Sequence, residues 1–208
     1  TMTVVNDKPV ASAGATLAYT ENAVAGVIDN ALTLTDADDS QIAGATVTIS
    51  AGLTSGDVLG FSTQNGISGA YNSGTGVLTL SGTATVAQYQ TALRTVTYSS
   101  TSNDPTATSA SRTIAWAATD ANSDGVGAQT SIGVTSTVNL TAVNDAPTLA
   151  AVAASYVDTA TLDSFGAASG TLVGADSDST TLTFGIASGT VTGGVSTLAG
   201  SYGSLAVN

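Results

Sequence analysis

The chain has 208 residues, of which 15 are acidic and 3 basic, and its formal net charge is −12. Such a charge repels nucleic-acid phosphates and anionic lipid headgroups, and no apolar run reaches the length of a spanning helix, so we expect neither nucleic-acid binding nor membrane insertion. Histidine and cysteine are both absent. The chain therefore lacks the commonest general base, the commonest transition-metal ligand and any disulfide.

Hydrophobic residues make up 42% of the chain and charged residues only 9%. Acidic disordered tails show the opposite balance, so this composition predicts a folded protein. Nearly all the acids are aspartates, and the residues that favour helix surfaces, Glu and Lys, are almost missing. This shortage argues against a helical protein and favours an all-β one.

Apolar and polar residues alternate along much of the chain, as expected for antiparallel strands that have one buried face and one wet face. Ile132 and Val134 begin the clearest such run, and Trp116 shares its parity with Ile114, which predicts a place for Trp116 in the core. Turn residues separate the runs, which is typical of a β-sandwich. The expected strands of the first part span residues 32–35, 45–49, 78–80, 96–98, 114–118 and 132–142.

Residues 85–93 break this alternation. Val86, Tyr89, Ala92 and Leu93 recur at helical spacing, and Thr85 is a suitable N-cap. We expect a short helix here that crosses between two sheets and carries no chemistry of its own.

A short motif occurs twice, as Val5-Asn6-Asp7-Lys8-Pro9 and as Val143-Asn144-Asp145-Ala146-Pro147. A repeated linker followed by acidic residues is typical of an array of modules. After the second copy we expect strands at 169–173, 181–186 and 202–208, too few to close a second sandwich. The predicted organisation is the end of a preceding module and a linker at 1–9, a β-sandwich at 10–143, a linker at 144–148 and a partial sandwich at 149–208.

Oxygen-bearing side chains gather at three places in the first part of the chain. Carboxylates so close in sequence repel one another unless water or a cation lies between them, and Ca²⁺ accepts irregular sets of six to eight oxygen ligands. A solvated, Asp-rich turn is the alternative for any single cluster, but three clusters together favour calcium. The clusters are Asn6 with Asp7, then Asp36 with Asp38 and Asp39, and finally Asp120 with Asn122 and Asp124.

The third cluster matches only half of an EF-hand loop. Residues 120–125 fit the first six positions, but the closing position holds Ser131 instead of glutamate, and no helices are expected on either side. We therefore expect calcium to bind in a different setting.

That setting is indicated by a resemblance to cadherin and bacterial cadherin-like domains. Its marks in this chain are Glu21-Asn22, Asp36-Ala37-Asp38, the segment 118–125 and the two Asn-Asp-x-Pro linkers. The resemblance implies tandem Ig/cadherin-like Greek-key β-sandwiches, the second incomplete, with Ca²⁺ ions between modules. It assigns upstream ions to Asn6, Asp7, Asp36, Asp38 and Asp120, and downstream ions to Asn144, Asp145, Asp176, Asp178 and Glu21.

The repeat style is most similar to that of large adhesins that bacteria export by type I secretion, the RTX-type adhesins. Residues 71–80 and 86–98 carry this likeness in the first part, and residues 170–203 resemble the first part of a VCBS repeat. The resemblance implies an extracellular, calcium-rigidified repeat module in the stalk of a bacterial surface adhesin or in a surface fibre.

The expected partners are neighbouring modules of the same polypeptide, with homotypic subunits in a fibre or coat and surface glycans as further options. The alternative function is a calcium-dependent module that binds carbohydrate or another surface polymer. We do not expect an enzyme. Arg94 and Arg112 are each expected to pair with a surface acid or to cover a sheet edge, and Lys8 lies in a linker.

Overall fold

The computed structural model describes residues 5–123, 125–153, 166–201 and 203–208. The chain divides into two compact units, Thr1–Val143 and Asn144–Asn208, here called unit 1 and unit 2. Within the described residues, no helix combines the length and the apolar character needed to span a bilayer.

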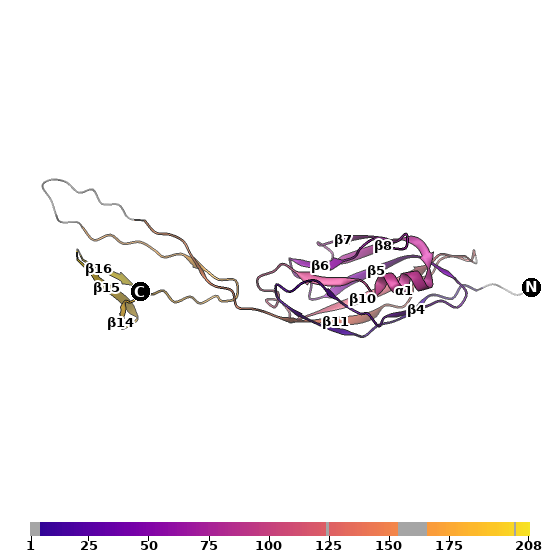
Figure 1. The fold of residues 1–208 in the computed structure, drawn as a ribbon, viewed down its shortest axis with the longest axis horizontal. Coiled ribbons are helices and arrows are strands. Elements are labelled where there is room, and N and C mark those ends of the chain that lie inside the picture. Colours follow the sequence, from indigo (N-terminus) through magenta and orange to yellow (C-terminus); the bar gives the residue numbers. More distant parts are fainter. Residues whose placement is uncertain (1–4, 124, 154–165, 202) are drawn as a thin grey trace, which may run out of the picture. The chain divides into compact units, whose positions relative to one another are not determined.

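Unit 1 is an all-β sandwich (Figure 1). Its larger layer is a six-stranded sheet in which all neighbours are antiparallel except β11 and β2, which pair in parallel. In spatial order its strands are β2 (Thr16–Thr20), β11 (Val134–Thr141), β10 (Ser111–Asp120), β5 (Gln41–Ala51), β8 (Val77–Thr85) and β7 (Ser68–Asn72).

The second layer of unit 1 is built from shorter strands. A three-stranded antiparallel sheet has the order β3, β9, β6, and a separate strand pair joins β1 to β4. These strands are β1 (Val10–Ser12), β3 (Gly26–Val27), β4 (Thr33–Thr35), β6 (Asp57–Gly60) and β9 (Thr97–Ser100).

The apolar side chains of unit 1 meet in one core, and β10 shows how the sequence builds it. Every second residue of β10 is buried, including Ile114 and Trp116. The core position predicted for Trp116 is confirmed, and its indole Nε1 donates to Ser136 Oγ at 3.0 Å. Ile132 was wrongly placed on a buried face: β11 begins only at Val134, and Ile132 lies before the strand and is exposed.

The predicted crossover helix is confirmed as α1 (Val86–Leu93). Thr85 accepts a hydrogen bond from the Gln88 amide, and the Gln88 side chain accepts one from the Thr85 amide, which together satisfy two helix-end donors. Tyr89, Ala92 and Leu93 are buried. The helix leads from β8 of the large sheet to β9 of the small one, so it carries the chain from one layer to the other.

Arg112 is not at the surface, as the sequence had suggested, but is fully buried beside Asp57. Its Nε donates to Asp57 Oδ2 at 2.6 Å, and Tyr98 Oη donates to Asp57 Oδ1 at the same distance. Other guanidinium protons reach carbonyl oxygens of the loop 101–110, including Pro105 O at 2.8 Å. The prediction of a surface position was wrong because a buried arginine needs a buried acid beside it. That acid, Asp57, lies 55 residues away in the sequence, where no local pattern reveals the pairing.

A second buried carboxylate, Asp29, also organises the loops around it. It accepts hydrogen bonds from the amides of Gly14, Ala15 and Ala31 and from Ser136 Oγ. Burial alone would raise the pKa of Asp29, but these donors outweigh it, and the pKa lies below its usual value. The ionised form of Asp29 therefore stabilises this part of the fold.

Unit 2 contains two small antiparallel pieces. β12 (Thr148–Leu149) pairs with β13 (Gly174–Ala175), and β14 (Thr190–Thr192), β15 (Val195–Gly200) and β16 (Gly203–Val207) form a three-stranded sheet.

Of the strands expected in unit 2, only the last is present, as β16; Tyr202 lies outside the described residues. The strands expected at 169–173 and 181–186 do not form. Among the described residues of unit 2 no apolar side chain is buried, and Val173, Val191 and Leu205 are exposed. Alternation predicts strands only where a facing layer covers the apolar side, and the described part of unit 2 supplies no such layer.

Candidate metal centres

Three loops of unit 1 meet at the end of the sandwich where the chain enters. Asp36 follows β4, Asp120 is the last residue of β10, and Asn6 precedes β1. Hydrogen bonds between these loops, described below, bring together seven of the predicted ligands. We call them the entry cluster of unit 1: Asn6, Asp7, Asp36, Asp38, Asp39, Asp120 and Asn122.

Asp36 shapes the tightest part of this cluster. Its Oδ1 accepts hydrogen bonds from the amides of Asp38 at 3.3 Å and Asp39 at 2.9 Å, so the turn folds around its own first carboxylate. As a result, one oxygen from each of Asp36, Asp38 and Asp39 lies within 4.8 Å of the others. Three carboxylates held at this separation form the kind of oxygen group that binds a hard cation.

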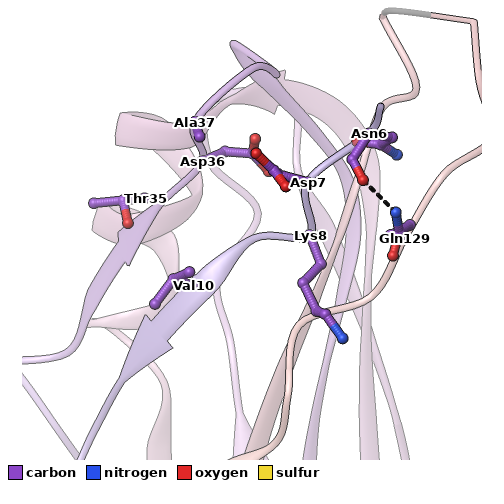
Figure 2. Close-up of a pocket in the computed structure, with 8 residues that line it drawn as sticks. All are labelled: Asn6, Asp7, Lys8, Val10, Thr35, Asp36, Ala37 and Gln129. Atoms are coloured by element: carbon purple, nitrogen blue, oxygen red, sulfur yellow. Dashed lines mark hydrogen bonds between the residues drawn. The ribbon is translucent and has the colours of Figure 1, made fainter. Parts of the chain in front are cut away.

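The linker segment is tied to this turn. The Asp7 amide donates to Asp38 Oδ2 at 3.0 Å, and Asn6 Nδ2 donates to Asp120 Oδ2 at 3.2 Å. Gln129 Nε2 donates to the backbone oxygen of Asn6, as Figure 2 shows. Asn6 is buried although it lies in a linker. Gln129 had not been predicted, because nothing in its sequence surroundings distinguishes it from other loop glutamines.

The described residues that follow β10, 121–123 and 125–129, are tied to the cluster by hydrogen bonds. The Ser123 amide donates to Asp39 Oδ1 at 2.8 Å, and the amides of Asn122 and Gln129 donate to the carboxylate of Asp120 at 3.1 and 2.8 Å. The side-chain oxygen of Asn122 accepts a hydrogen bond from the Gly127 amide. The predicted ligand Asp124 lies outside the described residues.

Several buried side-chain oxygens of the predicted ligands have no hydrogen-bond partner. In native proteins nearly all buried polar atoms have a hydrogen-bond partner, so an exception requires an explanation. Among the described residues, the buried side-chain polar atoms without a partner all belong to predicted calcium ligands. They are Asn6 Oδ1, Glu21 Oε1, Asp36 Oδ2, Asp39 Oδ2, Asp145 Oδ2 and Asp178 Oδ1.

No described side chain neutralises the entry cluster of unit 1. Within the described residues, Arg112 and Asp57 form the one ion pair between side chains, and both lie elsewhere. Lys8 is exposed, and Figure 2 shows its side chain extending away from Asp36. Burial, followed by the charge of Asp38, raises the pKa of Asp36 above its usual value. The cluster therefore joins the buried Asp39 and Asp120 and the half-buried Asp36 to the exposed Asp7 and Asp38, without a positive partner among the described side chains.

Unit 2 repeats the same turn. The Asp145 amide donates to Asp178 Oδ2, as the Asp7 amide does to Asp38. Asp176 Oδ1 accepts from the amides of Asp178 and Ser179, both at 2.9 Å. We call Asp145, Asp176 and Asp178 the entry cluster of unit 2. Asn144 differs from its counterpart, because it is exposed and its Nδ2 donates to Asp145 O.

Glu21 lies apart from both clusters. Its amide donates to Thr141 O, and its Oε2 accepts from the Val143 amide at 2.8 Å. Because β10 and β11 are antiparallel and Ser111 pairs with Asn139, this site is at the end of the large sheet opposite Asp120. The other carboxylate oxygen, Oε1, is buried without a partner. The prediction that Glu21 shares an ion with the downstream linker remains a prediction.

Comparison with known proteins finds a similarity to part of a much longer protein. This chain is 46% identical over 84 residues to halomucin from Haloquadratum walsbyi (strain DSM 16790 / HBSQ001). The matched region covers 38% of this chain and 1% of halomucin. The chain thus spans a very small part of the relative that it matches. No family model and no solved structure matches the chain.

Proposed function

We propose that this chain is a structural part of a large extracellular surface protein, in which calcium fixes each linker to the module that follows it. The similarity to halomucin, a cell-surface protein of great length, supports the first half of this proposal. The repeated linker motif is also typical of a protein built from an array of modules. We include in this proposal the role predicted from the sequence, that of a stalk or fibre module in a surface adhesin.

The calcium half of the proposal is carried by the unpartnered buried oxygens. Apart from Glu21 Oε1, these oxygens lie in each unit on both sides of one hydrogen bond, from the linker amide of Asp7 or Asp145 to the turn that follows. An amide N–H would satisfy one such oxygen and a water molecule at most two, whereas one divalent cation coordinates several at once. The donors are all oxygens, which suits calcium better than a softer metal.

A bound ion would change both stability and linker order. Without it, the carboxylates of Asp36, Asp38 and Asp39 repel one another and favour opening of the turn. With it, binding to the folded state alone adds stability that grows with the logarithm of calcium concentration. At the roughly millimolar calcium levels found outside cells, even sites with a Kd of about 10⁻⁴ M are filled.

The test is isothermal titration of the full chain with CaCl₂ after EGTA treatment, at constant ionic strength and with MgCl₂ as a parallel titrant. We expect calcium to bind and to raise the melting temperature. Asp36→Asn should weaken binding in unit 1, and Asp178→Asn should weaken binding in unit 2. Each substitution removes one charge while retaining an oxygen that can accept the hydrogen bonds of the turn.

Asp104→Asn is the matched control, since it makes the same change in a loop outside both clusters. It should leave the titration unchanged. Calcium that raises the melting temperature no more than an equal ionic strength of NaCl would contradict the proposal, as would an equal effect of the Asp36 and Asp104 variants.

A further inference from the structure

The outer face of the large sheet in unit 1 has no charge, although the chain as a whole carries a net charge of −12. The six strands of this sheet contain only two ionisable side chains with a charge at neutral pH, Arg112 and Asp120, and both are buried. Glu21 and the entry cluster, by contrast, lie at the two ends of the sheet. The strands between those ends therefore form a broad surface without exposed charged side chains.

Small side chains cover this face in regular rows. One row crosses four strands as Ala117, Thr46, Thr79 and Ala70, which are paired in register. Threonine, serine and alanine occupy most of the other outward positions as well, and the largest apolar side chain among them is that of Val77. Such side chains lose little rotamer entropy when they are covered, and a sheet that carries them can approach another surface closely.

We propose that this face packs against the same face of a second copy of the chain, which gives lateral association of surface modules. Two copies that approach by any surface bearing acidic clusters meet strong like-charge repulsion. When they approach by this face, the clusters stay at its ends, where salt screens charges beyond about 8 Å at 0.15 M ionic strength. Like-charge repulsion therefore opposes approach by this face less than approach by a surface that bears an acidic cluster.

The size of the face is sufficient for a pairwise contact. Six strands about 4.8 Å apart, each contributing about eight residues with a rise of about 3.3 Å, give roughly 700 Å². A standard stable interface buries about 800 Å² per partner. Methyl groups supply apolar contact and hydroxyl groups hydrogen-bond directly or through water, so we expect a weak contact, with a Kd of about 10 μM to 1 mM.

The first test is sedimentation of the full chain over this concentration range, in EGTA so that bridging by calcium cannot contribute. We expect association that Thr46→Lys weakens at least about tenfold. Thr63→Lys, at an exposed loop position outside the large sheet, is the matched control. Both substitutions make the net charge less negative, so a general charge effect would strengthen association in both, whereas the proposal requires loss only at Thr46. Circular dichroism confirms that each variant is folded.

The second test uses the absence of cysteine from the chain. With a short bis-maleimide, Thr46→Cys should yield covalent dimers and Thr63→Cys should not. A chain that stays monomeric throughout the range, or variants at 46 and 63 that behave alike, would overturn the proposal. So would slow reaction of the monomeric Thr46→Cys variant with a monofunctional maleimide, because another part of the chain would then cover the face. None of these results bears on calcium binding, so the two proposals fail independently.

Discussion

In unit 1 the amide of Asp7 donates to Asp38, and in unit 2 the amide of Asp145 donates to Asp178 in the same arrangement. Behind these matching turns the two units differ. Unit 1 has a buried core that includes Trp116, whereas the described residues of unit 2 bury no apolar side chain. The turn and its hydrogen bond to the linker therefore form with or without a buried apolar core behind them. This independence is consistent with the proposal that calcium binds at each linker.

The largest expected effect would break the core of unit 1. Arg112→Met leaves Asp57 buried without its positive partner, and such losses cost about 3–5 kcal/mol of stability. The measurement is urea unfolding followed by the fluorescence of Trp116, which is the only tryptophan and so reports on unit 1. Arg94→Met is the control, because the Arg94 Nε donates to a carbonyl oxygen, that of Leu32. Equal losses in the two variants would show that the buried pair has no special role.

Exchanging the residues at one matching position of the two turns tests how each turn contributes to calcium affinity. Unit 1 has Asp39 where unit 2 has Ser179, and both amides donate to the first aspartate of the turn. We expect Asp39→Ser to lower calcium affinity in unit 1 about tenfold, and Ser179→Asp to raise it in unit 2 by a similar factor, about 1.4 kcal/mol each.

Calorimetric titration of both variants checks this exchange. Ser177→Asp is its control, because it adds the same charge at a neighbouring exposed position. A rise in affinity that is as large for Ser177→Asp as for Ser179→Asp would show that total charge, not ligand position, controls binding.

A smaller effect is expected at the crossover helix, which has no counterpart among the described residues of unit 2. Thr85→Ala removes the side-chain half of the capping box and should lower the stability of unit 1 by about 1 kcal/mol. The change is measured as a shift in the urea midpoint of Trp116 fluorescence. Thr85→Ser, which keeps the hydroxyl, should restore most of the loss, and an equal loss in both variants would contradict the cap.

Much of unit 1 could be predicted from sequence because its signals are local or periodic. The alternation in β10, the helical spacing of Val86, Tyr89 and Leu93, and the cap at Thr85 each act within a few residues. The turn at Asp36 is equally local. The buried pair of Arg112 and Asp57 joins distant strands, and no periodicity reports such a contact in a single sequence. Gln129 is brought to Asn6 by the same kind of long-range folding.

In unit 2 the same sequence signals predicted fewer of the observed strands correctly. Residues 181–186 alternate as a strand does but form none, because alternation records only which face would be buried. Whether a covering layer exists is a property of the whole fold. The acidic turn at Asp176 needs no such layer, which is why its local geometry agrees with that of unit 1.

The smallest expected effect is a pH-dependent stabilisation by Asp36→Asn in the absence of calcium, which calcium reverses. Burial and the charge of Asp38 raise its pKa, so its contribution to stability is fully present below the usual aspartate value and is lost as the pH rises through the raised value. In EGTA at neutral pH, Asp36→Asn should therefore raise the melting temperature slightly, and at acidic pH this gain should vanish. In calcium the same variant should lower it. A variant that is destabilised to the same degree with and without calcium would remove the electrostatic explanation.

The most direct test of the central claim is a crystal structure of the full chain grown with calcium, with data collected for anomalous scattering. The account predicts an anomalous peak within bonding distance of Asn6 Oδ1, Asp36 Oδ2 and Asp39 Oδ2, and a second one beside Asp145 and Asp178. Well-ordered side chains in both clusters without such peaks, or with water in their place, would contradict it.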